Sequence, residues 1–346
     1  MKSFVLTSFF LVTILSYSQD SISRIAFGSC QHQDKKLDVL KTVISHHPDL
    51  FIYLGDNIYG DTDNMCVMKR KYRKLSKNNN FKNLRKTTPI IATWDDHDYG
   101  QNDIGKYYLK KEQSKKIFLK FFREPKGSIR RKHEGIYTSY EYKVSGKILQ
   151  IILLDCRTFR SDLLPYNGSL KNDTNYHYKP DYSQHMRSDS TMLGKTQWKW
   201  LEEQLKKPAD IRIIGSSTQF ATQYNGYEAW ANFPFEQLRM LELIRTTGAN
   251  GTFFISGDVH YAELSKLGNT GFYPIYDLTC SGLTEEWKFA TPNMFREGEP
   301  IMENHFGIID IDWSKEIPSI SLEVWDQNDQ RRIQQVIPLN ELHIKE

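Results

Sequence analysis

Cysteine is scarce in this sequence, with 4 among 346 residues. A small secreted domain held together by a dense disulfide framework is therefore excluded. Long apolar runs are lacking as well, because the run at residues 4–15 falls short of the roughly 20 residues that a membrane-spanning helix needs. The net charge is only +4, and the charges look evenly spread. We therefore expect no membrane span and no nucleic-acid-binding module.

The beginning of the chain has the pattern of an export signal. Lys2 is followed by the apolar run 4–15 and then by small and polar residues. This order of a charged start, a short apolar core and a small-residue exit is typical of a cleavable signal peptide. It predicts a signal peptide at residues 1–19 and a secreted or periplasmic protein whose single domain spans residues 20–346. No cysteine lies near the predicted cleavage site, so we expect no lipid anchor.

Short apolar runs alternate with helical patterns along the rest of the chain, whose hydrophobic share of 39% and charged share of 25% are typical of globular proteins. The runs that read as strands are residues 24–27, 50–54, 90–93, 147–154, 211–214, 251–255 and 273–278. Helical patterns occupy residues 37–45, 110–122, 197–206 and 235–245. Three further strand patterns at residues 307–313, 319–325 and 330–338 follow at the end. This alternation predicts an α/β fold that a mixed sheet closes.

Side chains that can bind metals or phosphate follow the ends of the first six strand patterns. In chain order they are Cys30, then Asp56 and Tyr59, then Asp96 and His97, then Arg157, then Gln219, and finally Asp258 and His260. Ligands of α/β sheets bind beyond the carboxyl ends of strands, so these residues can converge on one cleft. A single Asp after a strand is usually a helix cap or a turn residue. Several such side chains at one topological position instead favour a metal site.

The chemistry of these side chains indicates which cations they would bind. The carboxylates of Asp56, Asp96 and Asp258 suit hard cations, and that of Asp56 can bridge two ions. The phenol of Tyr59 has a pKa near 10 and becomes a good ligand only beside a strong Lewis acid, which favours ferric iron. Cys30 would bind as a thiolate. Two alternatives stay open: Tyr59 as a packed aromatic, and Cys30 as a buried or disulfide-bonded thiol.

The two histidines and the arginine have different expected roles. His260 fits a metal ligand. His97 lies amid carboxylates, which would hold it protonated, so it can donate a proton to a leaving oxygen. Arg157 can clamp a phosphate oxygen in bidentate fashion. A salt bridge between Arg157 and Asp155 or Asp162 is an equally good interpretation.

Taken together, five segments resemble the alkaline phosphatase D (PhoD-like) family of the calcineurin-like metallophosphoesterase superfamily, which is akin to the purple acid phosphatases. They are Phe27-Gly-Ser-Cys-Gln31, Leu54-Gly-Asp-Asn-Ile-Tyr59, Thr93-Trp-Asp-Asp-His-Asp98, Met192-Leu-Gly-Lys-Thr-Gln-Trp-Lys-Trp-Leu201 and Ile255-Ser-Gly-Asp-Val-His260. The Gly-Asp-x-x-Tyr element is specific when it occurs together with Asp-Asp-His-Asp. The resemblance covers most of the chain after the signal.

This resemblance implies a four-layer αββα sandwich with mixed sheets and a site that contains ferric iron and calcium. It implies iron ligands Cys30, Asp56, Tyr59 and His260, and second-metal ligands Asp56, Asp96 and Asp258. Gln219 stands roughly where purple acid phosphatases have a histidine ligand. Compared with purple acid phosphatases, this chain has Asp96 in place of an asparagine and Asp258 in place of a histidine. Both changes add negative charge and favour calcium over zinc as the second ion.

We therefore expect a secreted phosphoesterase in which a metal-bound hydroxide attacks a small-molecule or polymeric phosphate ester. One alternative is a nucleotidase or phosphodiesterase that uses zinc or manganese. Another is a non-catalytic secreted binding protein on the same fold. The polar stretch at residues 161–190 lacks periodicity and predicts a long loop, either a cover over the site or a surface insertion.

Overall fold

The computed structural model describes residues 22–172 and 179–345. The expected signal peptide at residues 1–19 lies outside the described residues. Within them, no helix is both long and apolar enough to cross a bilayer. The four cysteines are free thiols, and Cys66 alone among them is exposed.

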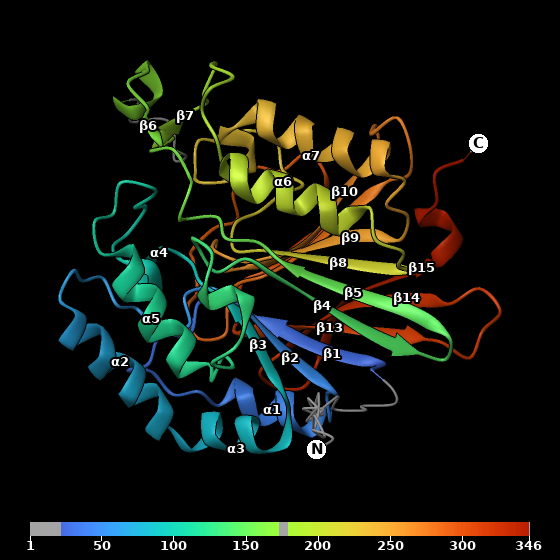
Figure 1. Cartoon of the computed structure of the whole chain (residues 1–346), viewed down its shortest axis with the longest axis horizontal. Helices are drawn as coiled ribbons and strands as arrows, with labels where there is room; N and C mark the ends of the chain where they lie inside the picture. Colours follow the sequence, from blue (N-terminus) through green and yellow to red (C-terminus); the bar gives the residue numbers. More distant parts are fainter. Residues whose placement is uncertain (1–21, 173–178, 346) are drawn as a thin grey trace, which may run out of the picture.

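Two mixed sheets lie face to face at the centre of the molecule (Figure 1). The first has the order β15-β14-β13-β1-β2-β3. Its strands are β1 (Arg24–Gly28), β2 (Leu50–Leu54), β3 (Ile90–Thr93), β13 (His305–Asp312), β14 (Ser319–Asp326) and β15 (Arg331–Pro338). Strands β1, β2 and β3 are parallel, whereas β13 joins β1 in antiparallel fashion and continues into β14 and β15. The expected closing strands are thus confirmed.

The second sheet has the order β12-β10-β11-β9-β8-β5-β4. Its strands are β4 (Thr138–Val144), β5 (Lys147–Leu153), β8 (Ile211–Ser216), β9 (Thr252–Ser256), β10 (Ala262–Leu267), β11 (Ile275–Cys280) and β12 (Arg296–Ile301). Strands β5, β8, β9 and β11 are parallel, and the others pair in antiparallel fashion at the two edges.

Helices cover the outer face of each sheet, which confirms the four-layer αββα sandwich (Figure 1). The first sheet carries α1 (Val39–Ser45), α2 (Met65–Lys77), α3 (Asn79–Thr87), α4 (Asp96–Tyr99) and α5 (Lys111–Phe121) on its side of the molecule. The second carries α6 (Gly194–Leu205) and α7 (Pro234–Thr247). A two-stranded ribbon of β6 (Leu164–Pro165) and β7 (Tyr182–Ser183) lies apart from both sheets.

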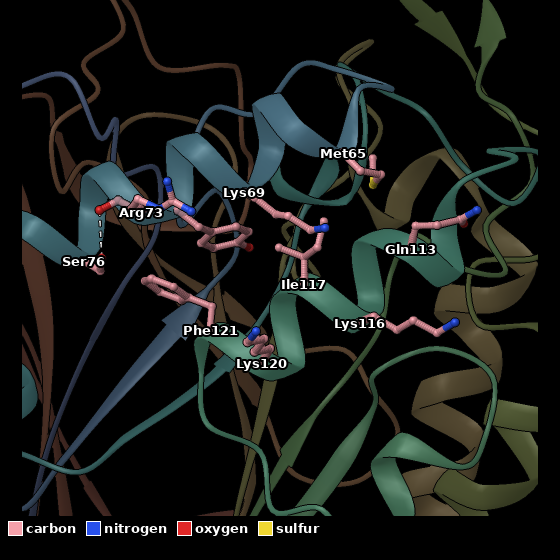
Figure 2. Close-up of a pocket in the computed structure, with 10 residues that line it drawn as sticks. Met65, Lys69, Arg73, Ser76, Gln113, Lys116, Ile117, Lys120 and Phe121 are labelled. Carbon is pink, nitrogen blue, oxygen red and sulfur yellow. Dashed lines mark hydrogen bonds between the residues drawn. The ribbon is translucent and has the colours of Figure 1, made fainter.

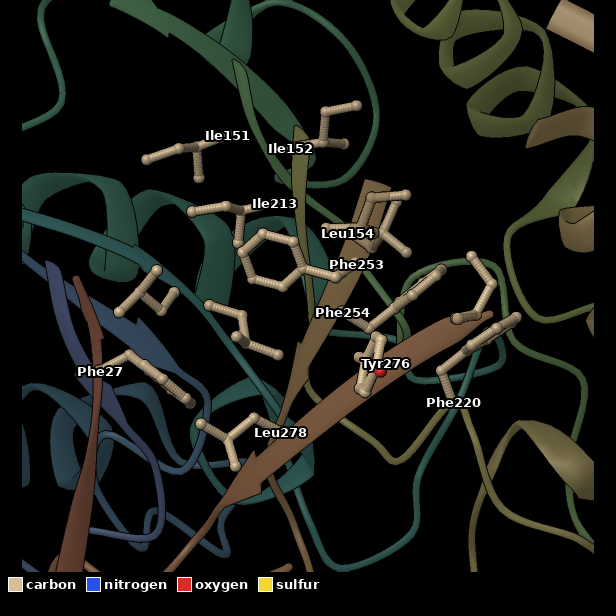
Figure 3. Close-up of a cluster of buried hydrophobic side chains, with 14 of the residues drawn as sticks. Phe27, Ile151, Ile152, Leu154, Ile213, Phe220, Phe253, Phe254, Tyr276 and Leu278 are labelled. Carbon is tan, nitrogen blue, oxygen red and sulfur yellow. The ribbon is translucent and has the colours of Figure 1, made fainter. Parts of the chain in front are cut away.

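Alternating side chains of the first sheet enter two different cores. In β2, Ile52 and Leu54 belong to the core between the sheets, whereas Phe51 and Tyr53 face the helices. Both faces of this strand are buried, which explains its unbroken apolar sequence. Figure 3 shows Phe27 of β1 pointing into the inter-sheet core that the second sheet also fills with aromatic and aliphatic side chains. The packed core fixes the ends of the parallel strands, where the candidate ligands lie.

Candidate metal centre

Four of the predicted ligands, Asp56, Asp96, Asp258 and His260, line one cavity of about 290 Å³. Cys30 follows β1, Asp56 and Tyr59 follow β2, and Asp96 follows β3. Asp258 and His260 follow β9 of the other sheet. Both sheets therefore contribute to the site, as the topology of parallel strands predicts.

One group of ligand atoms comes from Cys30, Asp56 and His260, which lie within 4.8 Å of one another. The Cys30 Sγ is 3.6 Å from Asp56 Oδ2, and the Tyr59 hydroxyl is 2.9 Å from His260 Nε2. Together with Tyr59, this group contains the four side chains that the sequence resemblance implies as iron ligands. A thiol, a phenol, an imidazole and a carboxylate at these distances suit a transition-metal ion.

A second group consists of carboxylates. Asp95, Asp96 and Asp258 offer oxygens within 4.8 Å of one another, and Asp56 and His97 form a further such group with Asp96. Asp56 therefore belongs to both sides of the cluster, which is the position that a bridging ligand needs. Asp95 was not among the residues predicted from the sequence, although it directly precedes Asp96.

Four of the predicted ligands have a left-handed backbone conformation, which is uncommon outside glycine. Their φ angles are 58° at Cys30, 49° at Asp56, 84° at Asp258 and 60° at His260. Such conformations persist where the surrounding structure fixes them, and they gather at functional sites. Gly55 leaves the space that this packing requires, because a Cβ there would lie 2.5 Å from the Cβ of Asp95.

The electrostatics of the cluster fit a bound cation. Burial and the neighbouring acidic groups raise the pKa of Cys30, Asp56 and Asp258 well above their usual ranges. Burial likewise lowers the pKa of His260 to about 4, which keeps its imidazole neutral and able to bind a metal. The Oδ1 atoms of Asp56 and Asp96 are buried and accept no hydrogen bond from the residues described. A cation would satisfy these oxygens and stabilise the crowded negative charges.

His97 lies at the edge of the same cavity and is held by Asp61. Its Nδ1 is 2.5 Å from Asp61 Oδ1, and its ring lies against that of Tyr59 with the centroids 4.3 Å apart. Burial alone would lower the pKa of His97, but the hydrogen bond to Asp61 and the charge of Asp96 raise it to about 9. The imidazole is thus cationic, as we predicted from the acidic residues next to His97 in the sequence. Asp61 itself was missed, because nothing in the sequence marks it as a partner of His97.

Arg157 occupies a different position from the one expected. Its guanidinium is fully buried, donates from Nε to Asp95 Oδ1 at 2.5 Å and from Nη1 to both Glu228 oxygens at 2.8 and 2.9 Å. The structure therefore places Arg157 in an internal ion pair and not as a clamp at the cavity surface. The partners are also not the expected ones, because the guanidinium of Arg157 does not pair with Asp155, which accepts a hydrogen bond from the backbone N–H of Arg157 instead.

Gln219 is likewise engaged away from the cavity. Its amide nitrogen donates to Glu263 at 2.6 Å and to Thr279 at 3.1 Å, and Gln219 does not line the cavity. In this structure its amide N–H groups support β10 and β11, and nothing places its side chain among the candidate ligands.

The stretch around Asn102 and Asp103 positions Asp96. The backbone N–H of Asp103 donates to Asp96 Oδ2 at 2.7 Å, and Asp103 has a φ of 57°. Tyr182, from the predicted loop at 161–190, donates its hydroxyl to Asp103 and lines the cavity. This loop therefore reaches the site, which favours the interpretation as a cover; its residues 173–178 lie outside the described part.

Aromatic rings of two loops also line the cavity. The Trp287 ring lies 5.1 Å from that of Tyr227 and 6.4 Å from that of His260, measured between centroids. Trp287 and Tyr227 both line the cavity. The strand and helix patterns gave no signal for these loop residues.

A family model described as PhoD-like phosphatase matches residues 25–297. Among curated proteins, the chain is similar to alkaline phosphatase D of Bacillus subtilis (strain 168), with 24% identity over 281 residues. The match covers 70% of this chain and 46% of that protein, so the chain spans about half the length of its curated relative.

Solved structures with the same fold include one described as the structure of PhoD. Its TM-score is 0.65 at 16% identity, covering 91% of this chain and 71% of that one. A dimetal phosphatase from Danio rerio has a TM-score of 0.55 at 11% identity, covering 92% of this chain and 100% of that one. GAP50 of Plasmodium, described as the anchor in the inner membrane complex, has a TM-score of 0.56 at 14% identity, covering 94% and 89%. At these identities the likeness concerns the fold.

Proposed function

Because the chain belongs to the PhoD-like phosphatase family, we propose that it is a metal-dependent phosphoesterase whose active site is the cavity at the strand ends. One observation carries this proposal. Cys30, Asp56 and His260 come from distant parts of the chain and bring their ligand atoms within 4.8 Å of one another, beside the carboxylates of Asp96 and Asp258. No packing argument explains such a concentration of buried acidic groups.

Cys30, Asp56, Tyr59 and His260 would hold a ferric ion, and Asp56, Asp96 and Asp258 would hold calcium. Zinc or manganese are the alternative cations. When bound, such cations supply the positive charge that neutralises phosphate oxygens and lowers the pKa of water. The donor types support this assignment, since the first group contains soft and phenolic donors and the second contains only carboxylates.

His97 would donate the proton that the leaving oxygen needs. Asp61 holds its Nδ1, so Nε2 is the ring nitrogen that remains for a substrate. The partial exposure of His97 at the cavity supports this role, because a general acid must reach the leaving group. Asp61 is then a positioning residue that fixes the ring orientation.

Arg157 would act on the site through its neighbours. Its guanidinium fixes Asp95, and its Nη2 lies 3.7 Å from Asp96 Oδ1. The arginine thus orients carboxylates around the cavity and offsets part of their charge. The organic part of the ester would lie against Trp287 and Tyr227, whose rings line the cavity.

The N-terminal pattern supports secretion or export to the periplasm as part of the same proposal, with residues 1–19 removed. Sequencing the N-terminus of the protein recovered outside the cytoplasm would test this directly. A chain that keeps its first residues would contradict it.

The activity is tested with chromogenic phosphate monoesters and diesters, before and after chelation and with each cation restored separately. We expect hydrolysis that chelation removes and that iron with calcium restores. Restoration by zinc or manganese alone would favour the alternative metals. A protein that binds cations and these esters without turnover would instead be a non-catalytic binding protein on the same fold.

A further inference from the structure

The positive charges of this chain are concentrated on three helices, so the even distribution expected from the sequence is wrong. Helices α2, α3 and α5 together carry thirteen Lys and Arg residues and one acidic residue, Glu112. The whole chain has a net charge of only +4, so the remainder is net negative. These helices cover the outer face of the first sheet (Figure 1). The molecule therefore has one strongly basic face.

A groove of about 570 Å³ runs between α2 and α5 on this face. Its floor is apolar and consists of Met65 and Phe121, which are partly exposed, and of Tyr72 and Ile117, which are 2% and 8% exposed. Apolar surface of this kind is usually covered in a monomeric soluble protein, and an uncovered groove of this size marks a binding surface.

Basic side chains line the rim of this groove on both sides (Figure 2). They are Lys69 and Arg73 of α2, and Lys116 and Lys120 of α5. All four are exposed, and none forms an ion pair with an acidic residue in the described part of the chain. Other bases of the same helices do have partners: Lys74 pairs with Asp34, and Lys111 pairs with Glu134 at 2.8 Å.

Apolar side chains also project into solvent on the segment that leads into α5. Leu109, two residues before α5, is 93% exposed, and Tyr107 is 67% exposed. A neighbouring hollow shares Met65 and Gln113 with the groove and is also lined by Lys110. The apolar and basic features are therefore continuous from the groove towards Leu109.

We propose that this basic face binds the surface of a bilayer that contains anionic phospholipids. The phosphate groups would pair with Lys69, Arg73, Lys116 and Lys120, while acyl carbons contact the apolar floor and Leu109. Peripheral binding of this kind combines attraction between basic residues and anionic lipids with shallow burial of apolar side chains. A soluble polyanion would use the charges alone and would leave the apolar floor and Leu109 uncovered, so the lipid surface accounts for more of the observations.

The test is co-sedimentation with vesicles of phosphatidylcholine alone or with about one third phosphatidylglycerol. All variants are compared with the same N-terminus as the wild-type protein, so differences in vesicle binding report the basic face. The groove variant combines Lys69→Glu, Arg73→Glu, Lys116→Glu and Lys120→Glu. The control combines Lys195→Glu, Lys199→Glu, Lys206→Glu and Lys207→Glu, which make the same change in net charge around α6.

We expect the wild-type chain and the control to bind the anionic vesicles similarly, and the groove variant to bind at least about tenfold more weakly. About 1 M NaCl, where the screening length is about 3 Å, should weaken wild-type binding. Leu109→Ser should reduce binding without changing the charge. Equal binding by the groove variant and the control would overturn the proposal. The proposal would also be overturned if Leu109→Ser bound vesicles as the wild type does and the wild type bound soluble polyphosphate as tightly as anionic vesicles. That result would identify a polyanion site instead.

Discussion

The carboxylates of Asp95 and Glu228 face the guanidinium of Arg157, whereas those of Asp56 and Asp258 nearby have no ion-pair partner among the described residues. Both clusters are made of buried acidic groups at the ends of the same sheets. The first is balanced within the chain. The second is not, and its groups have pKa values well above their usual ranges because burial and like charges oppose ionisation.

This difference distinguishes a structural role from a ligand-binding role. A buried charge without a partner is costly, so a chain keeps such a cluster only where something else stabilises it. The balanced cluster contains its own counter-charge, the guanidinium of Arg157. The unbalanced one needs cations. Mutations in the first should therefore cost stability, and mutations in the second should cost cation binding and activity.

The largest expected effect follows from Asp56→Asn, since Asp56 belongs to both groups of ligand atoms. Changes that only touch the neighbours of metal ligands already reduce affinity by 10–100-fold, so loss of a bridging ligand should weaken cation binding by more than about a hundredfold. Hydrolysis of a chromogenic ester should become undetectable. Circular dichroism should show an intact fold, because Asn fills the same space.

Asp310→Asn, at the partly exposed Arg24 pair, is the control and should keep full activity. Near-normal turnover by Asp56→Asn would refute the bridging role.

In the balanced cluster, Arg157→Met should lower the free energy of unfolding by about 3–5 kcal/mol, because it leaves buried carboxylates without their partner. Urea denaturation measures this. Arg24→Met is the matched control, since the Arg24–Asp310 pair is partly exposed and should cost at most about 1 kcal/mol. A variant with unchanged stability but much weaker substrate binding would show that Arg157 clamps phosphate after all.

Replacing His97 tests whether this residue donates a proton to the leaving group or binds a cation. His97→Asn should reduce kcat by about 10²–10⁴ while the cation content stays unchanged. Asp61→Asn should have a smaller effect of the same kind, because it only releases the ring. Loss of a cation from His97→Asn would place this histidine among the ligands instead.

The smallest effect on turnover is expected for Tyr59→Phe, which leaves Cys30, Asp56 and His260 in place. If ferric iron is bound, the wild-type protein should absorb visible light through the phenolate, and this variant should lose that band. Tyr99→Phe, a buried tyrosine that donates to Gly105 O, should keep it. A colourless, active wild-type protein that contains zinc or manganese would favour those metals.

Much of the fold followed from sequence because its central strands are buried on both faces. The predicted bounds of β2 and β3 agree with the structure, and the ligands after them lie where parallel strands end. Helices α2 and α3 were missed, although Asn64 and Asn78 cap them with side chains that accept from the following N–H groups. Their buried residues Met68, Tyr72 and Leu75, and Phe81 and Leu84, recur at helical spacing, so the apolar period was also present in the sequence.

Pairs of side chains that lie far apart in the sequence and meet only in the folded domain could not be predicted. Glu228 lies in a loop without periodicity, 71 residues from Arg157, and no local pattern links the two. The separation of Asp61 from His97 is 36 residues, again without a shared element. Strand ends can be placed from hydrophobic patterns, whereas side-chain pairing between loops depends on packing of the whole domain.

The most direct measurement is anomalous X-ray scattering from a crystal of the active protein, with data collected at the absorption edges of iron, zinc and manganese. An anomalous peak bounded by Cys30 Sγ, Asp56, the Tyr59 hydroxyl and His260 is the expected result. Active crystals that show no anomalous peak between these four side chains at any of the three absorption edges would contradict the account.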